Sequence, residues 1–274
     1  MKEKTAMVIV DSHCHASPYW FEPVEVLLFQ MDRNGVDKAT LVQFSGQTDN
    51  SYILDCVRRY PGRFSAVVGI DTDRVDAPVI LKQLVKQGAE GIRLRATTRS
   101  PGKDPLAIWR ACAEMGLPVT CGGEKEQFAS EGFSTLVRAL PDLAIIIEHL
   151  GDARDGEQPP YDAYRRVLAL SQHPNTYIKV GGLGEICPRP KPFRQPFPFG
   201  PVPPLVEMAY RAFGASRMLW GSNYPPSAHV EGYANTLHWL DDHVRSFCTE
   251  KDRSWIFGET ALSLYKLRIP PSDN

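Results

Sequence analysis

The sequence predicts a (β/α)8 TIM barrel, and three observations support this fold class. Short apolar runs rich in β-branched residues alternate with longer amphipathic segments along the whole chain. Eight such strand–helix units can be counted. The 274 residues are 43% hydrophobic, which suffices for one large core, so we expect a single domain spanning 1–274. The competing fold is an open doubly wound sheet, but no glycine-rich phosphate-binding fingerprint follows the first strand.

The expected strands are short apolar runs, and they cover 7–10, 39–44, 65–70, 91–94, 117–121, 143–148, 176–180 and 217–220. The amphipathic segments between them should form helices, the clearest at 51–60, 78–87, 134–140, 161–172, 204–213 and 232–248. Pro23 and Pro105 stand where a first helical turn would begin. Gly35, Gly88 and Gly116 follow helical runs, as residues that end helices do.

The segment 187–204 departs from this alternation, because it contains eight prolines and three phenylalanines. Proline cannot continue a helix or a central strand, so we expect a loop after the seventh strand. Two interpretations are open, a rigid surface connection and a lid over the barrel mouth. In the second, aromatic side chains close the site and cationic ones bind an anion; these are Phe193, Phe197, Phe199, Arg189, Lys191 and Arg194.

Composition excludes several classes of function. The net charge is -1 and the pI about 6.7, so we expect no nucleic-acid partner. No apolar run approaches the roughly 20 residues of a membrane helix, and the N-terminal apolar run is too short for a signal peptide. Six cysteines without disulfide-like spacing predict reduced thiols and a cytoplasmic protein. A homo-oligomer remains open, since no surface stripe is decisive.

Barrel active sites lie at the carboxyl ends of the strands, so each strand end is a candidate. The first strand ends in Asp11-Ser12-His13-Cys14-His15. Side chains alternate along a strand, so His13 and His15 should point to the same side and can reach one metal ion. Asp11 could hold a ring nitrogen or the strand end in place.

The fourth and fifth strands end in groups suited to binding a substrate. Arg93 and Arg95 share one side of the fourth strand, and two guanidinium groups there would suit a carboxylate. The alternative is that one of them makes a structural salt bridge. After the fifth strand, Gly122 and Gly123 let the backbone approach a ligand, and Glu124 could reach inward.

The sixth and eighth strands end at His149 and Asn223. His149 directly follows an apolar strand at the predicted catalytic face. Asn223 lies in the run Trp220-Gly221-Ser222-Asn223-Tyr224-Pro225. The other histidines fall in expected loops or helices and are interpreted as structural or surface groups; they are His173, His229, His238 and His243.

Taken in order, these motifs resemble the amidohydrolase superfamily, and most closely its amidohydrolase 2 branch of small lactonases and decarboxylases. The resemblance implies a (β/α)8 hydrolase with one metal ion or none. In metal-using members the strand-1 histidines, a strand-5 histidine and a strand-8 aspartate hold the ion. The strand-6 histidine polarises the substrate or steers water, and the strand-8 aspartate takes a proton from the attacking water.

This chain departs from that pattern twice. Its fifth strand ends in Cys121-Gly122-Gly123 without a histidine, and Asn223 stands where aspartate is expected. An amide can coordinate or accept a hydrogen bond, but it cannot act as a general base. His13, His15 and His149 are therefore the predicted ligands of one divalent ion, zinc above others, whose occupancy stays open. Without an ion, the histidines would polarise the substrate carbonyl themselves.

The predicted function is hydrolysis of a small carboxylated or sugar-derived substrate, most simply a lactone. His149 orients water or the oxyanion, Asn223 positions by a hydrogen bond, and Arg93, Arg95 and Glu124 bind substrate. The proton acceptor is open among Glu124, His149 and Asp152. Two alternatives remain, a non-oxidative decarboxylase of the same branch and a barrel that binds a ligand without catalysis.

Overall fold

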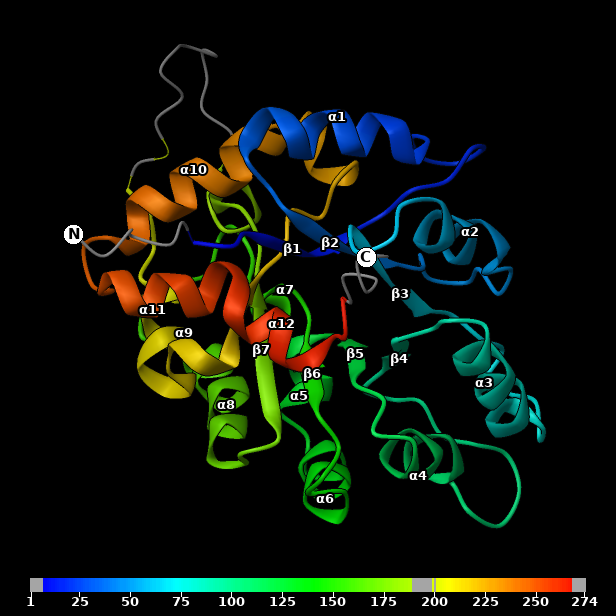
Figure 1. Cartoon of the computed structure of the whole chain (residues 1–274). Coiled ribbons are helices and arrows are strands. Elements are labelled where there is room, and N and C mark those ends of the chain that lie inside the picture. The colour runs from blue at the N-terminus through cyan, green and yellow to red at the C-terminus, as the bar shows by residue number, and fades with distance from the viewer. Residues whose placement is uncertain (1–6, 189–198, 200, 268–274) are drawn as a thin grey trace.

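The computed structural model describes residues 7–188, 199 and 201–267. Within them, eight parallel strands pair in chain order and form a nearly closed barrel with helices outside it (Figure 1). The predicted TIM barrel is therefore confirmed. The strands are β1 Val10–Cys14, β2 Lys38–Val42, β3 Phe64–Val68, β4 Gly91–Arg95, β5 Val119–Gly122, β6 Ile145–Ile147, β7 Thr176–Val180 and β8 Met218–Trp220.

Helices follow the strands as expected for βα units. The longer ones are α1 Val24–Asn34, α2 Ser51–Arg59, α3 Ala77–Lys86, α4 Ala107–Glu114, α6 Glu131–Ala139, α8 Asp162–Leu168, α9 Leu205–Phe213 and α10 Tyr233–Val244. Short ones are α5 Lys125–Phe128, α7 His149–Asp152, α11 Glu250–Ser254, α12 Thr260–Leu264 and the 3-10 helix η2 Leu183–Glu185. The expected helix 232–248 is shorter than predicted, because its regular hydrogen bonding ends at Val244.

The barrel interior is apolar at the amino ends of the strands. Val10, Val67 and Ile146 belong to one buried apolar cluster with Tyr265, which follows α12. Helix α12 packs against β1 and β8, near the middle of Figure 1 in red. A larger apolar cluster fills the layer between the strands and the outer helices. The amino end of the barrel is therefore filled, and the open end is the carboxyl end.

Strands β1 and β8 meet through backbone and side-chain hydrogen bonds. The Asp11 carboxylate accepts from the Ser222 backbone N–H at 2.8 Å and from the Ser222 hydroxyl at 2.6 Å. The His15 N–H donates to the Tyr224 carbonyl at 2.8 Å. Burial raises the pKa of Asp11 to about 6, although the Ser222 hydrogen bonds oppose that shift. Asp11 therefore holds the end of the strand in place and does not hold a histidine ring nitrogen.

Gly221 lets β8 approach β1 at this seam. A Cβ atom at Gly221 would lie 2.6 Å from the His13 Cβ and 2.8 Å from its backbone nitrogen. These distances are shorter than real Cβ contacts, so a larger residue would displace His13. The position of the first histidine thus depends on the glycine that directly follows the last strand.

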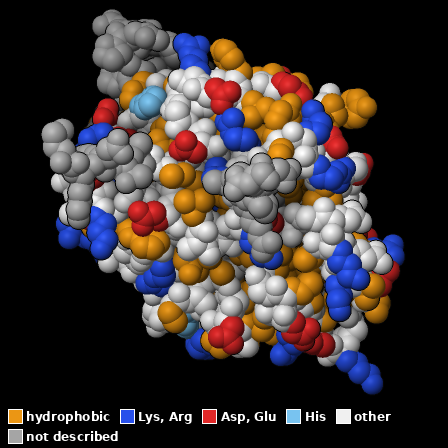
Figure 2. Space-filling view, in the orientation of Figure 1, with side chains coloured by type: hydrophobic (Ala, Val, Ile, Leu, Met, Phe, Trp, Pro, Cys, Tyr) orange, Lys and Arg blue, Asp and Glu red, His pale blue; other side chains and the backbone are white. Residues whose placement is uncertain are grey.

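Most of the proposed lid lies outside the described residues, including Phe193 and Phe197. Phe199 is described, and its ring packs edge-on against Trp239 of α10 at a centroid distance of 5.2 Å. On the face drawn in Figure 2, acidic and basic side chains are interspersed. In the described part of the chain, no helix is long and apolar enough to cross a bilayer.

Candidate active site

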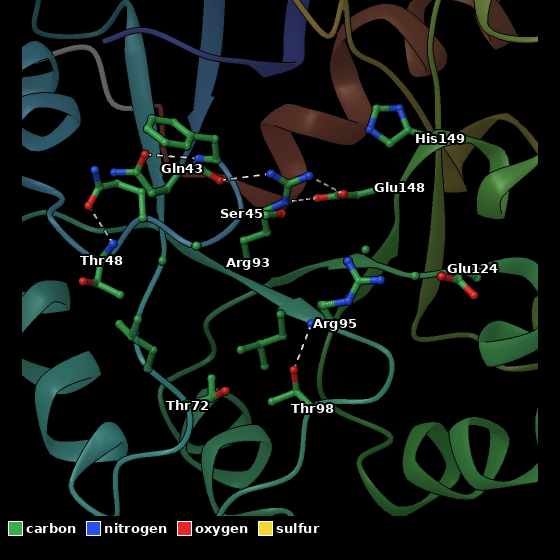
Figure 3. Close-up of a pocket in the computed structure, with 18 of the residues that line it drawn as sticks. Gln43, Ser45, Thr48, Thr72, Arg93, Arg95, Thr98, Glu124, Glu148 and His149 are labelled. Atoms are coloured by element: carbon green, nitrogen blue, oxygen red, sulfur yellow. Dashed lines mark hydrogen bonds and ion pairs between the residues drawn. The ribbon is translucent and has the colours of Figure 1, made fainter. Parts of the chain in front are cut away.

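A polar pocket of about 420 Å³ opens at the carboxyl ends of β2 to β6 (Figure 3). Its size is in the range of small-molecule sites. The residues that line it include four of those predicted from the sequence, Arg93, Arg95, Glu124 and His149. The predicted substrate-binding residues therefore share one cavity with the strand-6 histidine.

Three histidines come together next to this pocket, and one of them, His149, lines it. The ring centroid of His13 lies 5.0 Å from that of His15 and 4.9 Å from that of His149. A β-bulge between Asp11 and Cys14 interrupts the pairing of β1, yet both of its histidines face the same cluster. We call His13, His15 and His149 the histidine cluster.

His15 presents a bare nitrogen to the cluster. Its Nδ1 lies 2.6 Å from the Val42 carbonyl oxygen, which can only accept a hydrogen bond. Nδ1 therefore holds the ring proton, and Nε2 keeps its lone pair. Burial, helped by the nearby Arg93, lowers the pKa of His15 to about 4, so the ring is neutral at neutral pH.

His149 is paired with a carboxylate that the sequence analysis did not consider. Its Nδ1 lies 3.0 Å from Oε1 of Glu185, at the end of η2. The Nδ1–H of His149 donates this hydrogen bond and the carboxylate accepts it, so Nε2 of His149 keeps its lone pair. Burial lowers the pKa of His149, but Glu185 and Glu148 outweigh it and raise the pKa above its ordinary value.

The backbone at His149 has an uncommon left-handed conformation. His149, Leu150 and Asp152 have φ angles of 49°, 50° and 68°, which cost energy in residues other than glycine. Gly151 lies in the same turn, and a Cβ there would come within 2.4 Å of Val167. This turn directs the His149 ring toward the other two histidines.

Asn223 also has a left-handed backbone, with φ of 52°, a conformation that asparagine tolerates. Its backbone N–H donates to the His13 carbonyl at 2.7 Å. Its side-chain amide donates to Oε1 of Glu185 at 3.5 Å. Asn223 therefore bridges β1 to the Glu185 carboxylate.

Arg93 and Arg95 have different environments. Arg93 donates from Nε and Nη2 to the two oxygens of Glu148, at 2.9 and 2.8 Å, and from Nη1 to the Gln43 carbonyl. Burial would raise the pKa of Glu148, but Arg93 and His149 lower it below its ordinary value. The Arg95 guanidinium has no ion-pair partner among the described residues. Figure 3 draws it within the pocket.

Glu124 and Asp152 line the pocket, and no hydrogen bond joins either carboxylate to a histidine among the described residues. Glu124 precedes the first turn of α5, and its backbone N–H donates to the Gln127 side chain at 3.1 Å. Asp152 accepts a hydrogen bond from Arg154 at 2.6 Å. Of the three candidate proton acceptors, His149 is the one whose ring lies in the histidine cluster.

Lys179 is a second residue that the sequence analysis missed. This β7 side chain is 2% exposed, and its Nζ lies 3.3 Å from Oγ1 of Thr120 and 3.4 Å from Nδ1 of His13. Burial lowers the pKa of Lys179 to about 8, although Glu148 opposes the shift. The sequence held a signal for each of these residues. Lys179 is a charged residue inside an otherwise apolar strand, and Glu185 follows the same strand by five residues.

A group of potential metal ligands lies in the cluster, formed by His13, Glu148 and His149. Their ligand atoms all lie within 4.8 Å of one another. His13 Nε2 is buried and has no hydrogen-bond partner in the described part of the chain. Two features oppose a cation: Arg93 already occupies both Glu148 oxygens, and the Lys179 ammonium lies against His13.

A family model for amidohydrolases matches residues 10–267, almost the entire chain. The chain belongs to the amidohydrolase family. It is therefore an enzyme of a hydrolase family, and one whose members are generally metal-dependent.

Characterised relatives include lactone hydrolases. L-fucono-1,5-lactonase of Burkholderia ambifaria is 28% identical over 257 residues, or 88% of this chain and 84% of the lactonase. 4-Sulfomuconolactone hydrolase of Hydrogenophaga intermedia is 27% identical over 190 residues, or 67% of this chain and 58% of that hydrolase. An amidohydrolase of Burkholderia multivorans with bound zinc shares the fold, with a TM-score of 0.76 at 17% identity, over 95% of this chain and 100% of that one. Family membership and these relatives together support a lactonase-like hydrolase.

Proposed function

We propose that this amidohydrolase opens the ester bond of a small carboxylated or sugar-acid lactone by attack of water. The observation that supports it best is the pairing of His149 with Glu185 next to two further histidines, at the edge of a polar pocket. The relatives that hydrolyse an L-fucono-1,5-lactone and a sulfomuconolactone support the same substrate class.

His149 is the proposed general base. Water attacks the carbonyl carbon, and its proton passes to Nε2 of His149 while the carbonyl π-electrons move onto the oxygen. Glu185 stabilises the imidazolium through the Nδ1 hydrogen bond, and Asn223 orients Glu185. When the intermediate collapses, the ring C–O bond breaks, and His149 returns the proton to the leaving alkoxide. The product is the open hydroxy acid.

The carbonyl oxygen is proposed to lie against Nε2 of His13, since this buried nitrogen has no partner among the described residues. A donor aimed at the developing oxyanion stabilises the transition state more than the ground state. Arg95 is proposed to bind a substrate carboxylate because its guanidinium faces the pocket without an acidic partner in the described structure. Glu124 would accept hydrogen bonds from substrate hydroxyls at the opposite edge.

A single zinc ion is the cofactor that the sequence predicts, with His13, His15 and His149 as ligands. These residues do not fit that role in their present hydrogen bonds. An ammonium can only donate, so Nδ1 of His13 accepts from Lys179, and the ring proton lies on Nε2, which then cannot bind a metal. The reaction above therefore uses only groups of the chain.

Hydrolysis of a lactone panel tests the proposal, with one proton released per turnover as the readout. The panel contains L-fucono-1,5-lactone, other sugar-acid lactones and carboxylated unsaturated lactones. We expect turnover by the purified protein, and a loss of about 10³-fold in kcat for His149→Ala. His173→Ala is the matched control, because His173 lies near Ser134 of α6, outside the site.

Two further assays on the same protein distinguish the alternatives, a decarboxylase and a barrel that binds a ligand without catalysis. Release of carbon dioxide from aromatic carboxylic acids, without lactone turnover, would identify a decarboxylase. A rise in melting temperature with a carboxylated ligand, without any turnover, would identify a binding barrel. Either result would overturn the proposed hydrolysis.

A further inference from the structure

Lys179 is a buried residue that has no role in the proposed reaction. Its side chain points into the barrel from β7, opposite to the apolar face formed by Ile178 and Val180. Among the described residues, no carboxylate lies within ion-pair distance of its Nζ. A buried ammonium without a direct counter-ion costs folding free energy, so its retention calls for a functional explanation.

The contacts of Lys179 determine which nitrogen of His13 carries the proton. An ammonium has three donors and no acceptor, so Thr120 Oγ1 and His13 Nδ1 both accept from it. A neutral imidazole that accepts at Nδ1 carries its proton at Nε2. Nε2 is the nitrogen that is buried without a partner in the described part of the chain and belongs to the histidine cluster.

The three histidines then present different functional groups to one another in the histidine cluster, of which His149 lines the pocket. His13 presents an N–H donor, whereas His15 presents a lone pair because its proton is held by the Val42 carbonyl. His149 presents a nitrogen whose basicity is supported by Glu185. One donor and one supported base are what attack of water on a carbonyl requires, while a metal ion would require lone pairs from all of them.

We propose that Lys179 is a positioning residue that holds His13 in its Nε2–H form and supplies, at Nδ1, a fixed positive charge in place of a divalent metal ion. The expected effect of Lys179 on catalysis rests on the proposed function. The tautomer of His13 and the exclusion of a divalent cation are independent of that function.

The surrounding charges agree with this assignment. His13 is buried, and the Lys179 ammonium lies 3.4 Å from its Nδ1, so a second positive charge on the ring would be repelled. A neutral imidazole polarises a carbonyl by donating a hydrogen bond, without taking up a proton that it would have to release. A divalent ion at His13 would also meet the positive charges of Lys179 and Arg93.

The first measurement is made on the unmodified protein. Nitrogen-15 NMR of histidine-labelled protein reads the protonation of each ring nitrogen, and His13→Gln assigns the His13 signals. We expect Nε2 protonated and Nδ1 bare in His13, and the reverse in His15. A His13 ring protonated at Nδ1 would overturn the proposal without any need for a lysine variant.

The second measurement compares Lys179→Met with Lys38→Met. Methionine keeps the length of the side chain and removes its charge and donors. Lys38 is the matched control, because its ammonium donates to the Gly62 and Leu267 carbonyls at the opposite end of the barrel. We expect Lys179→Met to bind zinc at least tenfold more tightly than the wild type and the control in calorimetric titration.

Activity supplies the third readout. Lys179→Met should lower kcat by about 100-fold with KM changed less than threefold, because Lys179 acts on the oxyanion through His13 and does not touch the substrate. One equivalent of zinc bound more tightly by the wild type than by Lys179→Met would overturn the proposal. If no lactone is turned over by any variant, the proposed function fails, while the NMR and zinc measurements still decide the role of Lys179.

Discussion

The two sides of the site differ in how their side chains are held. In the histidine cluster, each ring has a hydrogen-bond partner on Nδ1, namely Lys179, Val42 or Glu185. On the pocket side, Arg95 is exposed and without an acidic partner in the described residues. The proposed reacting groups are therefore oriented before substrate arrives, whereas the proposed recognition groups are free to meet it. Changes on the first side should affect kcat, and changes on the second should affect substrate choice.

Among changes that leave the three histidines in place, removing the charge of Glu185 should have the largest effect on the comparison of the two sides. Glu185→Gln keeps the shape of the side chain but no longer stabilises a protonated His149. We expect kcat to fall about 100-fold. The base must be neutral, and its pKa is raised in the native enzyme, so activity should rise with pH through a value above about 6.5. In Glu185→Gln that pKa falls, and the rise should move to lower pH.

A pH–rate profile of kcat/KM for both proteins measures this shift. Glu207→Gln is a suitable control, because Glu207 pairs with Arg211 on the outer helix α9. If the rise stays at the same pH in Glu185→Gln, the titrating group is not His149 in contact with Glu185, and the assignment of the base is wrong.

The next effect tests the recognition side. Arg95→Met should lower kcat/KM for carboxylated lactones by about 10- to 100-fold, the worth of one charge-assisted hydrogen bond. Uncharged sugar lactones should be affected less than threefold. Arg154→Met is the matched control, because Arg154 lines the same pocket but is paired with Asp152. An equal loss on charged and uncharged lactones would show that Arg95 does not recognise the carboxylate.

Asn223→Asp tests whether the site lacks a base or already has one. A second carboxylate 3.5 Å from Glu185 should raise the pKa of His149 further and lower activity at pH 7 by about tenfold. The loss should disappear at alkaline pH, where His149 is neutral again. A gain in activity at pH 7 would mean that the eighth-strand carboxylate is the missing base, and that His149 has another role.

The smallest effect on activity is expected at Glu231, a buried carboxyl beside η2. Its Oε1 accepts from the Gly184 N–H at 3.0 Å, and burial raises its pKa to about 8 despite that bond. The folded protein therefore holds a proton that the unfolded chain releases near pH 4.5. Between pH 4.5 and about pH 8, the Glu231 carboxyl should therefore lower the unfolding free energy of the wild type by about 1.4 kcal/mol for each pH unit.

Glu231→Gln should remove this fall in stability toward alkaline pH and leave kcat within about twofold. Denaturant unfolding at pH 5, 7 and 8.5 measures it, with Glu207→Gln on the outer helix α9 again as the control. A variant whose stability falls with pH as steeply as that of the wild type would show that Glu231 is ionised in the folded protein.

The strand-end residues were predictable because the period of two is a local property. It placed His13 with His15, and it placed Arg93 and Arg95 on one pocket. Which arginine would be neutralised was not predictable, because Glu148 reaches Arg93 from another strand. The same limit applies to Lys179 and Glu185, whose meaning lies in contacts across the barrel with His13 and His149. Sequence periodicity gives the direction of a side chain, and only the closed barrel gives its partner.

The seam between β1 and β8 has a consequence for the order in which the protein becomes active. Asp11 and Ser222 are 211 residues apart in the chain, yet their hydrogen bonds hold the strand end on which His13 lies. Contacts of such separation form late in folding, because their loop-closure entropy is large. A nascent chain on the ribosome therefore lacks the hydrogen bonds that hold the His13 strand end until its last strand has emerged. We therefore expect catalytic activity only after the first and last strands have paired.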